Sequence, residues 1–219
     1  IDTELQGLKD MILQMGGFVE QALDCATTSI LKFTPELLAN VNKHETKINE
    51  LQIRIDEACV NLLAKQAPVA RDLRLVFAIV KINTDLERMG DQSVNIALTT
   101  SDYSKSSSPP ISANMRTMIG LVKSIVRSSL DSFARQDVAL AREVLTQDDK
   151  IDELKDEMIR ENRAEMEKNS AMVEAGLSMI MTAKNLERLA DHATNIAEEV
   201  IYLMTGADVR HGHSASVNS

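Results

Sequence analysis

The amino-acid sequence predicts an all-α protein built from two tandem antiparallel three-helix bundles. The 219 residues include only 8 Gly and 4 Pro, no Trp and 3% aromatic residues, a composition that favours helix over sheet. One stretch occurs twice, as LERMGDQSVNIA at 86–97 and LERLADHATNIA at 186–197. A second repeat precedes it, as KINEL at 47–51 and KIDEL at 150–154. Each half should therefore carry three helices in the same order, with antiparallel neighbours joined by short connections.

Start and stop signals divide the chain into six helical segments. Thr34, followed by proline and glutamate, offers an N-cap and a first helical turn. Pro68 interrupts an otherwise helical stretch, Asp137 and Ser170 are candidate helix starts, and Gly206 follows the last periodic residue, as a helix stop does. The expected helices are 3–32, 35–65, 68–101, 112–134, 138–168 and 171–205.

The linker-like segment SKSSSPP lies near the midpoint of the chain and suggests where the two repeats separate. The first bundle is expected to extend over 1–103 and the second over 112–206, joined by a linker at 104–111. Residues 207–219 are polar and follow the helix stop, so we expect a disordered tail.

Composition also excludes some classes of function. The net charge of −9 argues against nucleic acid as the main partner, because Lys and Arg hold phosphate backbones. The sequence has no apolar run long enough to span a bilayer and no secretory apolar region. No glycine-rich phosphate loop, G-x-S-x-G or H-E-x-x-H motif occurs, so the sequence does not predict an enzyme of those classes.

The duplicated stretch carries a row of oxygen-bearing side chains on one helix face in each copy. A spacing of seven from Leu73 through Val80 places Glu87 in an apolar seam. The same spacing from Val173 through Ile180 places Glu187 in the corresponding seam of the second copy. A carboxylate there is costly unless it is paired, protonated or bound to a cation. The rows are Glu87, Asp91 and Asn95, and Glu187, Asp191 and Asn195, in which each asparagine is either a ligand or a residue that orients the ligands.

Residues at equal height in an antiparallel helix pair are equidistant from the turn, so their numbers have a constant sum. A turn at Pro68 and another at 169–170 set an acid-x-x-x-acid or acid-x-x-x-amide pair against each Glu-x-x-x-Asp row. Hard oxygen ligands converging from two helices suit Mg, Mn, Ca or ferric iron. The expected metal ligands are Glu45, Asn49, Glu87 and Asp91 in the first bundle, and Asp148, Asp152, Glu187 and Asp191 in the second.

The alternative is a charge network in which Arg88, Arg188, Lys47 and Lys150 neutralise the acids. These bases are at odd offsets from the acid rows, so we expect them to point elsewhere, but the sequence leaves the network open. A ferritin-like di-iron site is disfavoured because its Glu-x-x-His motif is absent. His192 is off the acid face and is interpreted as a polar surface or capping residue.

Arg71, Asp72 and Arg74 form a charged group near the turn before the third helix. Charged residues are common in the first turn of a helix, so the group is interpreted as a helix-start cluster, with an interaction site as the alternative.

Several of these motifs resemble the PhoU family. Residues 68–74 (PVARDLR), 85–88 (DLER) with the following Gly90-Asp91, and 191–198 (DHATNIAE) are similar to its two signatures, and the resemblance covers nearly the whole chain. It implies two three-helix bundles with a metal cluster on acid-x-x-x-Asp pairs in each. Asn49 departs from that pattern, so the first site should be weaker or hold fewer metals. Asn185 likewise stands where the first half has Asp85.

The resemblance also implies a function. Proteins of this family are cytoplasmic, commonly homodimeric regulators that act beside the phosphate ABC transporter ATPase and a sensor histidine kinase, and they contact the membrane only through these partners. They restrain phosphate uptake and the phosphate-starvation response. The leading hypothesis is therefore a non-enzymatic, metal-bearing adaptor. A carboxylate-bridged metalloenzyme, a purely structural scaffold and phosphate binding by the bound metal stay open as alternatives.

Overall fold

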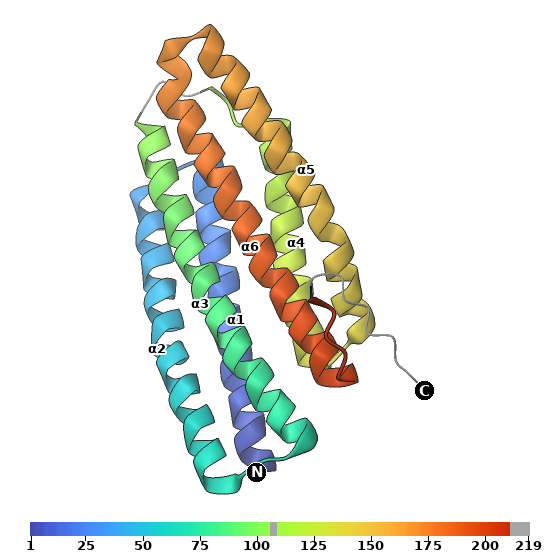
Figure 1. Ribbon diagram of the computed structural model, residues 1–219. Coiled ribbons are helices and arrows are strands. Elements are labelled where there is room, and N and C mark those ends of the chain that lie inside the picture. The colour runs from blue at the N-terminus through green and yellow to red at the C-terminus, as the bar shows by residue number, and fades with distance from the viewer. Residues whose placement is uncertain (106–108, 211–219) are drawn as a thin grey trace.

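The computed structural model describes residues 1–105 and 109–210, and within these ranges it contains helices and no strands. The all-α prediction with six α-helices is confirmed (Figure 1). The helices are α1 (Asp2–Leu31), α2 (Pro35–Gln66), α3 (Ala70–Ser104), α4 (Ala113–Arg135), α5 (Val138–Lys168) and α6 (Val173–Thr205), and a 3-10 turn, η1 (Ser170–Met172), precedes α6.

Three of the expected helix ends are confirmed, two by cap hydrogen bonds and one by its backbone conformation. The Thr34 hydroxyl accepts a hydrogen bond from the Leu37 N–H at 3.4 Å, and the Asp137 carboxylate accepts one from the Leu140 N–H at 3.0 Å. Each satisfies an amide that the first turn of a helix leaves without a backbone partner. Gly206 ends α6 with φ of 72°, a left-handed conformation that glycine adopts without steric cost.

Two helix starts differ from the prediction. Asn169, rather than Ser170, accepts a hydrogen bond from the Ala171 N–H at 3.0 Å, since asparagine is as good an N-cap as serine. The helix expected from Pro68 begins at Ala70, because its N-cap residue Val69 has extended backbone, with φ of −127° and ψ of 159°.

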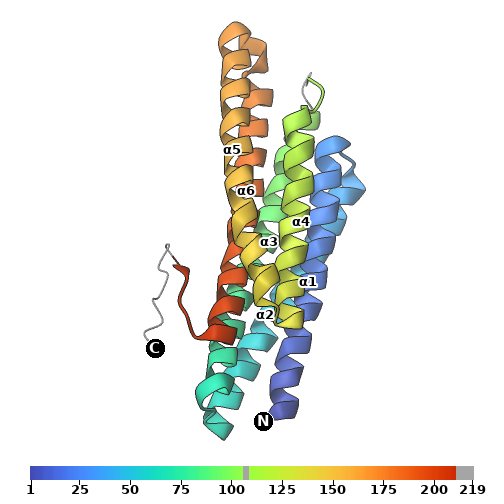
Figure 2. The same ribbon diagram turned by 90° about the vertical axis from the view of Figure 1, so that its right-hand side faces the viewer.

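The helices pack as two groups of three. α1, α2 and α3 contact one another, and so do α4, α5 and α6. α3 and α6 form the most extensive helix pair and join the two groups, with a smaller contact between α1 and α4. In Figure 1, α2 and α5 form the outer edges and α3 and α6 lie side by side in the centre; Figure 2 shows α1 and α4 on the opposite side of the molecule from α6.

The apolar seam of α3 is not the one predicted. Val80 is 37% exposed and the Glu87 side chain is 19% exposed, whereas Ile82, Leu86 and Met89 are fully buried. A spacing of seven slips by about 20° per repeat on a straight α-helix, and α3 must contact α1, α2 and α6 at once. Glu87 therefore flanks the core instead of standing in it. On α6 the Glu187 side chain is likewise 20% exposed, whereas Ile201 of the predicted seam is fully buried.

The segments outside the bundles are partly described. Ser104 belongs to α3, and the Tyr103 hydroxyl donates a hydrogen bond to the Pro109 carbonyl at 2.6 Å; the rest of the expected linker includes residues 106–108, which lie outside the described residues. The expected disordered tail falls mostly on 211–219, also outside them. None of the described helices is both long and apolar enough to cross a membrane.

Candidate functional site

The predicted register between α2 and α3 places the acid rows at matching height. The Asn83 side chain of α3 donates hydrogen bonds to the Gln52 carbonyl at 3.0 Å and to the Asp56 carboxylate at 2.9 Å, both on α2. A turn at Pro68 sets Asn83 opposite residue 53, so the contact with Gln52 lies within one residue of the predicted register. Because the helices are antiparallel, the same register sets Glu45 and Asn49 opposite the row on α3.

The first cluster contains three carboxylates and one amide, all half-buried: Glu45, Asn49, Glu87 and Asp91. The Asn49 amide donates a hydrogen bond to the Glu45 carboxylate within α2. Burial raises the pKa of Glu87, and the charges of Asp91 and Glu45 raise it further. The rows on α2 and α3 therefore act on each other electrostatically, as their placement at equal height requires.

The second cluster contains four half-buried carboxylates, Asp148 and Asp152 on α5 and Glu187 and Asp191 on α6. Burial raises the pKa of Asp191 to about 6, helped by the negative charges of the other three. Burial likewise raises the pKa of Asp148, with Asp152 and Glu187 adding to the effect. The Oδ1 atom of Asp148 is buried and has no hydrogen-bond partner among the described residues.

Two bases lie beside these clusters: Arg88, which the sequence analysis named in the charge-network alternative, and Lys155, which it missed. Lys155 lies 3.3 Å from the Asp152 carboxylate and 3.8 Å from that of Glu187. Burial lowers the pKa of Lys155, but its contacts with the acids outweigh burial and raise it. Arg88 lies 3.6 Å from Glu87 and 3.7 Å from Asp91. The expectation that the bases point elsewhere is therefore wrong for Arg88, since residues three apart are neighbours on a helix.

Two other bases do point away from the clusters. Lys47 pairs with Glu50 at 3.0 Å, and Lys150 pairs with Glu153 at 3.2 Å. All four of these side chains are about half exposed or more, so these ion pairs contribute little stability. The charge-network alternative thus rests on Arg88 and Lys155, and on Arg188, whose charge acts against the burial that raises the pKa of Glu187.

The donor set suits a hard cation, but the side chains as placed do not close around one. Among residues 1–105 and 109–210, no three His, Cys, Asp or Glu side chains lie close enough together to hold a metal ion. The uncompensated Oδ1 of Asp148 and the raised pKa of Asp191 mark an excess of negative charge that Lys155 only partly offsets. Binding a cation would require these carboxylates to turn inward and Lys155 to move out, so metal binding here stays a prediction.

A second polar cluster, which the sequence analysis missed, joins α3 to α6. Asp85 Oδ1 lies 2.8 Å from His192 Nδ1 and accepts a hydrogen bond from the Asn195 amide at 3.0 Å. The Asp85 and His192 side chains are 13% and 22% exposed. His192 is thus a contact between the bundles and not a surface or capping residue, and Asn195 is turned toward α3 instead of α5. Asn95, its counterpart, is exposed.

A further ion pair lies along the same contact. Lys81 of α3 lies 2.9 Å from Glu199 of α6, whose side chain is 8% exposed, and its ammonium stands 5.8 Å from the centre of the Tyr202 ring. Asp85 is followed at spacings of seven by Gln92, and Asn185 by His192 and then Glu199. That polar stripe was the sequence signal for a contact between the two repeats.

Comparison with known proteins explains the duplication. A family model described as the PhoU domain matches residues 12–100 and again residues 115–200. The chain belongs to the PhoU family. The two matches fall on α1–α3 and α4–α6, so each three-helix group is a PhoU repeat and the α3–α6 contact joins the repeats.

The relatives match over nearly the whole chain. The phosphate-specific transport system accessory protein PhoU of Serratia marcescens is 33% identical over 96% of this chain and 86% of its own length. The homologue from Pseudomonas putida is 37% identical over 96% of this chain and 82% of its own length. These two PhoU proteins are named as transport accessories.

Solved PhoU structures have the same fold. The crystal structure of PhoU from Pseudomonas aeruginosa gives a TM-score of 0.91 at 34% identity and covers 94% of this chain and 99% of that one. The PhoU structure from Streptococcus pneumoniae, described as a phosphate transport system regulatory protein, gives a TM-score of 0.87 at 27% identity. It covers 95% of this chain and 98% of that one. These likenesses confirm the fold class.

The contact between the PhoU repeats should depend on Asp85. Asp85→Ala leaves His192 and Asn195 without their shared acceptor, so we expect unfolding in urea to cost about 1–3 kcal/mol less than in the wild type. Asp85→Asn is the matched control, because Asn185 already stands at the equivalent position of the other repeat; it keeps one oxygen acceptor and should lose less. Equal urea midpoints for Asp85→Ala and the wild type would show that the cluster contributes nothing to stability.

Proposed function

We propose that this protein is a non-enzymatic, cytoplasmic regulator of phosphate uptake and of phosphate-starvation signalling. As a homodimeric adaptor it links the ATPase of a phosphate ABC transporter to a sensor histidine kinase and acts as a negative regulator of both uptake and the starvation response. The observation that carries the proposal is the family membership over both repeats, with relatives named as accessory proteins of the phosphate-specific transport system.

The surface of the bundle supports a docking role. The protein presents long helices, and helical faces are common recognition surfaces for other proteins. Several large apolar side chains of α3 and α6 are exposed, among them Phe77 at 55%, Leu177 at 50% and Met181 at 55%. Exposed apolar groups that lie together are typical of interaction surfaces, and Leu177 and Met181, four residues apart on α6, form such a pair.

We further propose that the two carboxylate clusters hold metal ions that support this role. Glu45, Asn49, Glu87 and Asp91 would supply the ligands in the first repeat, and Asp148, Asp152, Glu187 and Asp191 in the second. Oxygen donors of this kind suit Mg, Mn, Ca or Fe. The second cluster has one carboxylate more than the first, which supports tighter binding there, although Lys155 competes for the same acids.

A strain lacking the gene tests the regulatory proposal. At high phosphate we expect its phosphate-starvation genes to stay switched on and its phosphate uptake to be unrestrained, because the negative regulator is missing. A transcriptional reporter and uptake of labelled phosphate measure the two effects, and the wild-type gene supplied in trans should reverse both.

Normal repression in that strain at high phosphate would contradict the adaptor proposal. The metalloenzyme alternative makes a different prediction, since turnover by metal-loaded protein would be lost in Glu187→Ala. A deletion strain complemented with the Glu187→Ala/Asp191→Ala variant tests the adaptor role and the metal requirement separately. Normal regulation in that strain would support the adaptor role and show that it does not need metal at the second cluster.

A further inference from the structure

One cavity lies between the two repeats, at the end of the molecule where α1 and α3 begin and α4 and α6 end. Its volume is about 330 Å³, within the usual range for sites that take small molecules. Leu5, Leu75 and Leu203, all buried, form its apolar wall. Both repeats therefore contribute to a single concave surface outside the carboxylate clusters.

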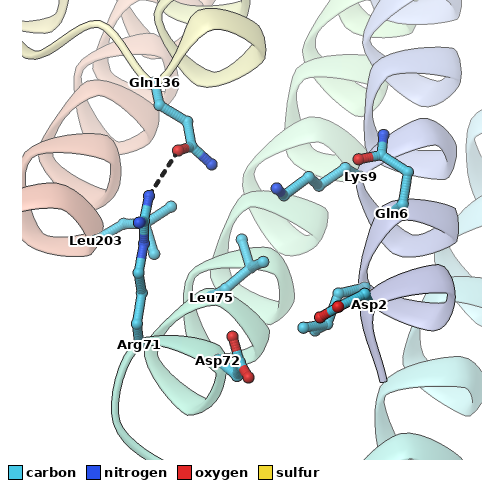
Figure 3. Close-up of a pocket in the computed structure, with 9 residues that line it drawn as sticks. Asp2, Gln6, Lys9, Arg71, Asp72, Leu75, Gln136 and Leu203 are labelled. Carbon is cyan, nitrogen blue, oxygen red and sulfur yellow. Dashed lines mark hydrogen bonds between the residues drawn. The ribbon is translucent and has the colours of Figure 1, made fainter.

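Two cations face this cavity without an acidic partner. Among the described residues, neither Lys9 nor Arg71 forms an ion pair, although the chain has a net charge of −9. Figure 3 shows the Lys9 ammonium and the Arg71 guanidinium on the same side of the cavity as the Gln136 amide. Unpaired cations that converge on one space favour an anionic ligand.

Amide groups extend this donor set. The Arg71 Nη2 group donates hydrogen bonds to Gln136 Oε1 at 2.9 Å and to Met204 Sδ at 3.8 Å. These contacts hold the guanidinium in place across the two repeats and leave its Nε and Nη1 groups available. Gln136 caps α4 in a left-handed conformation with φ of 53°, so its position is fixed by the helix end. Gln6 lines the cavity from α1. Arginine and lysine together with amide N–H groups are the donors that phosphate oxygens accept from.

Two carboxylates stand on the other side of the cavity. Figure 3 shows Asp2 and Asp72 on the side away from Gln136. An ionised carboxylate only accepts hydrogen bonds, so it suits a ligand that carries a proton of its own. Inorganic phosphate carries at least one proton near neutral pH, and a phosphate monoester, whose second pKa is about 6, carries one in its singly charged form, whereas sulfate is fully deprotonated. The mixed lining therefore favours a phosphate group over sulfate.

We propose that this cavity between the repeats binds a phosphate group, with Lys9 and Arg71 as its cationic donors and Asp72 as the acceptor of its proton. The ligand is either free inorganic phosphate or a small phosphate monoester, for which the cavity leaves room beside its apolar wall. The site is independent of the carboxylate clusters and of any bound metal. Because its residues come from α1, α3 and the loop after α4, a bound phosphate group would bridge the two repeats.

Isothermal titration of metal-free, full-length protein tests the site. Sodium phosphate, glycerol 3-phosphate and sodium sulfate are titrated in separate arms into buffer free of all three. We expect a saturable one-site heat with phosphate or with the monoester, and the tighter of the two identifies the source of the group. Lys9→Gln and Arg71→Gln should each weaken binding about tenfold or more. Asp72→Asn should weaken phosphate binding while improving sulfate binding.

Matched controls separate the site from general electrostatics and from the metal proposal. Lys32→Gln and Arg54→Gln remove the same charge from exposed positions just after α1 and on α2 and should leave binding unchanged. The Glu187→Ala/Asp191→Ala variant should also bind as the wild type does. The proposal is overturned if neither phosphate compound binds at about 10 mM, if Lys9→Gln and Arg71→Gln bind normally while their melting temperatures match the wild type, or if binding is lost with the acids of the second cluster.

Discussion

Saturating the metal-free protein with Mn²⁺ should raise its melting temperature by roughly 5–10 °C. A ligand at one hundred times its dissociation constant stabilises the folded state by about 2.7 kcal/mol, and a protein of this size gains about 2–4 °C for each kcal/mol. The physical reason lies in the second cluster, where four half-buried carboxylates face each other with Lys155 as their close counter-ion. A divalent ion would relieve that repulsion.

Glu187→Ala/Asp191→Ala should lose most of the rise, and Glu87→Ala/Asp91→Ala a smaller share, because the first cluster has Asn49 in place of an acid. Glu57→Ala/Glu143→Ala is the matched control, since it removes two exposed carboxylates that form no ion pair among the described residues. Calorimetry gives the shift and mass spectrometry the metal content. No rise with Mn, Fe, Mg or Ca would instead assign the acids to a charge network with Arg88 and Lys155.

The rise in melting temperature with Mn²⁺ should also depend on pH, because Asp191 changes its protonation state. Its pKa in the folded protein, about 6, lies above the ordinary value of 3.8, so proton binding to this group favours the folded state. The stability that proton binding to Asp191 gives the metal-free protein is fully present below about pH 4 and is lost as the pH rises through 6. A cation can take the place of the proton only when Asp191 is ionised. The rise in melting temperature with Mn²⁺ should therefore be larger at pH 7.5 than at pH 5.

The sequence predicted the facing acid rows because two independent regularities met there. Duplication fixed the order of the helices, and the constant sum of residue numbers in an antiparallel pair fixed their register, which the Asn83–Gln52 hydrogen bond places within one residue. Lys155 escaped because comparison of the repeats hides it: the equivalent position in the first repeat is Gln52. A feature present in only one repeat carries no signal of duplication.

The contact between the repeats was missed for a different reason. Duplication shows what the halves share, but Asp85 and His192 are matched in the other repeat by Asn185 and Gln92. The pairing of an acid with a histidine therefore exists once, on one side of the α3–α6 contact. The sequence gives the stripe at a spacing of seven, but which two helices meet along it depends on how the whole bundle packs.

The apolar seam of α3 gives the second large effect. Ile82→Ala should destabilise the protein by about 2–5 kcal/mol, because Ile82 is fully buried and its truncation leaves a cavity in close-packed surroundings. Val80→Ala, two positions away on the same helix, is the matched control: Val80 is 37% exposed, and its truncation should cost less than about 1 kcal/mol. Urea unfolding followed by circular dichroism measures both.

The sequence-based seam predicts the opposite order, with Val80 in the core. Ile82→Ala removes three carbon atoms and Val80→Ala removes two, a difference worth only about 0.8 kcal/mol. Alanine favours the helix in both cases, so helix propensity cannot account for the larger difference that we expect. If Val80→Ala proved the more destabilising, α3 would have to be rotated from its position in the structure, and Glu87 would return to the core. The carboxylate rows would then be buried far more deeply, so this pair of variants also tests how accessible the first cluster is to a cation.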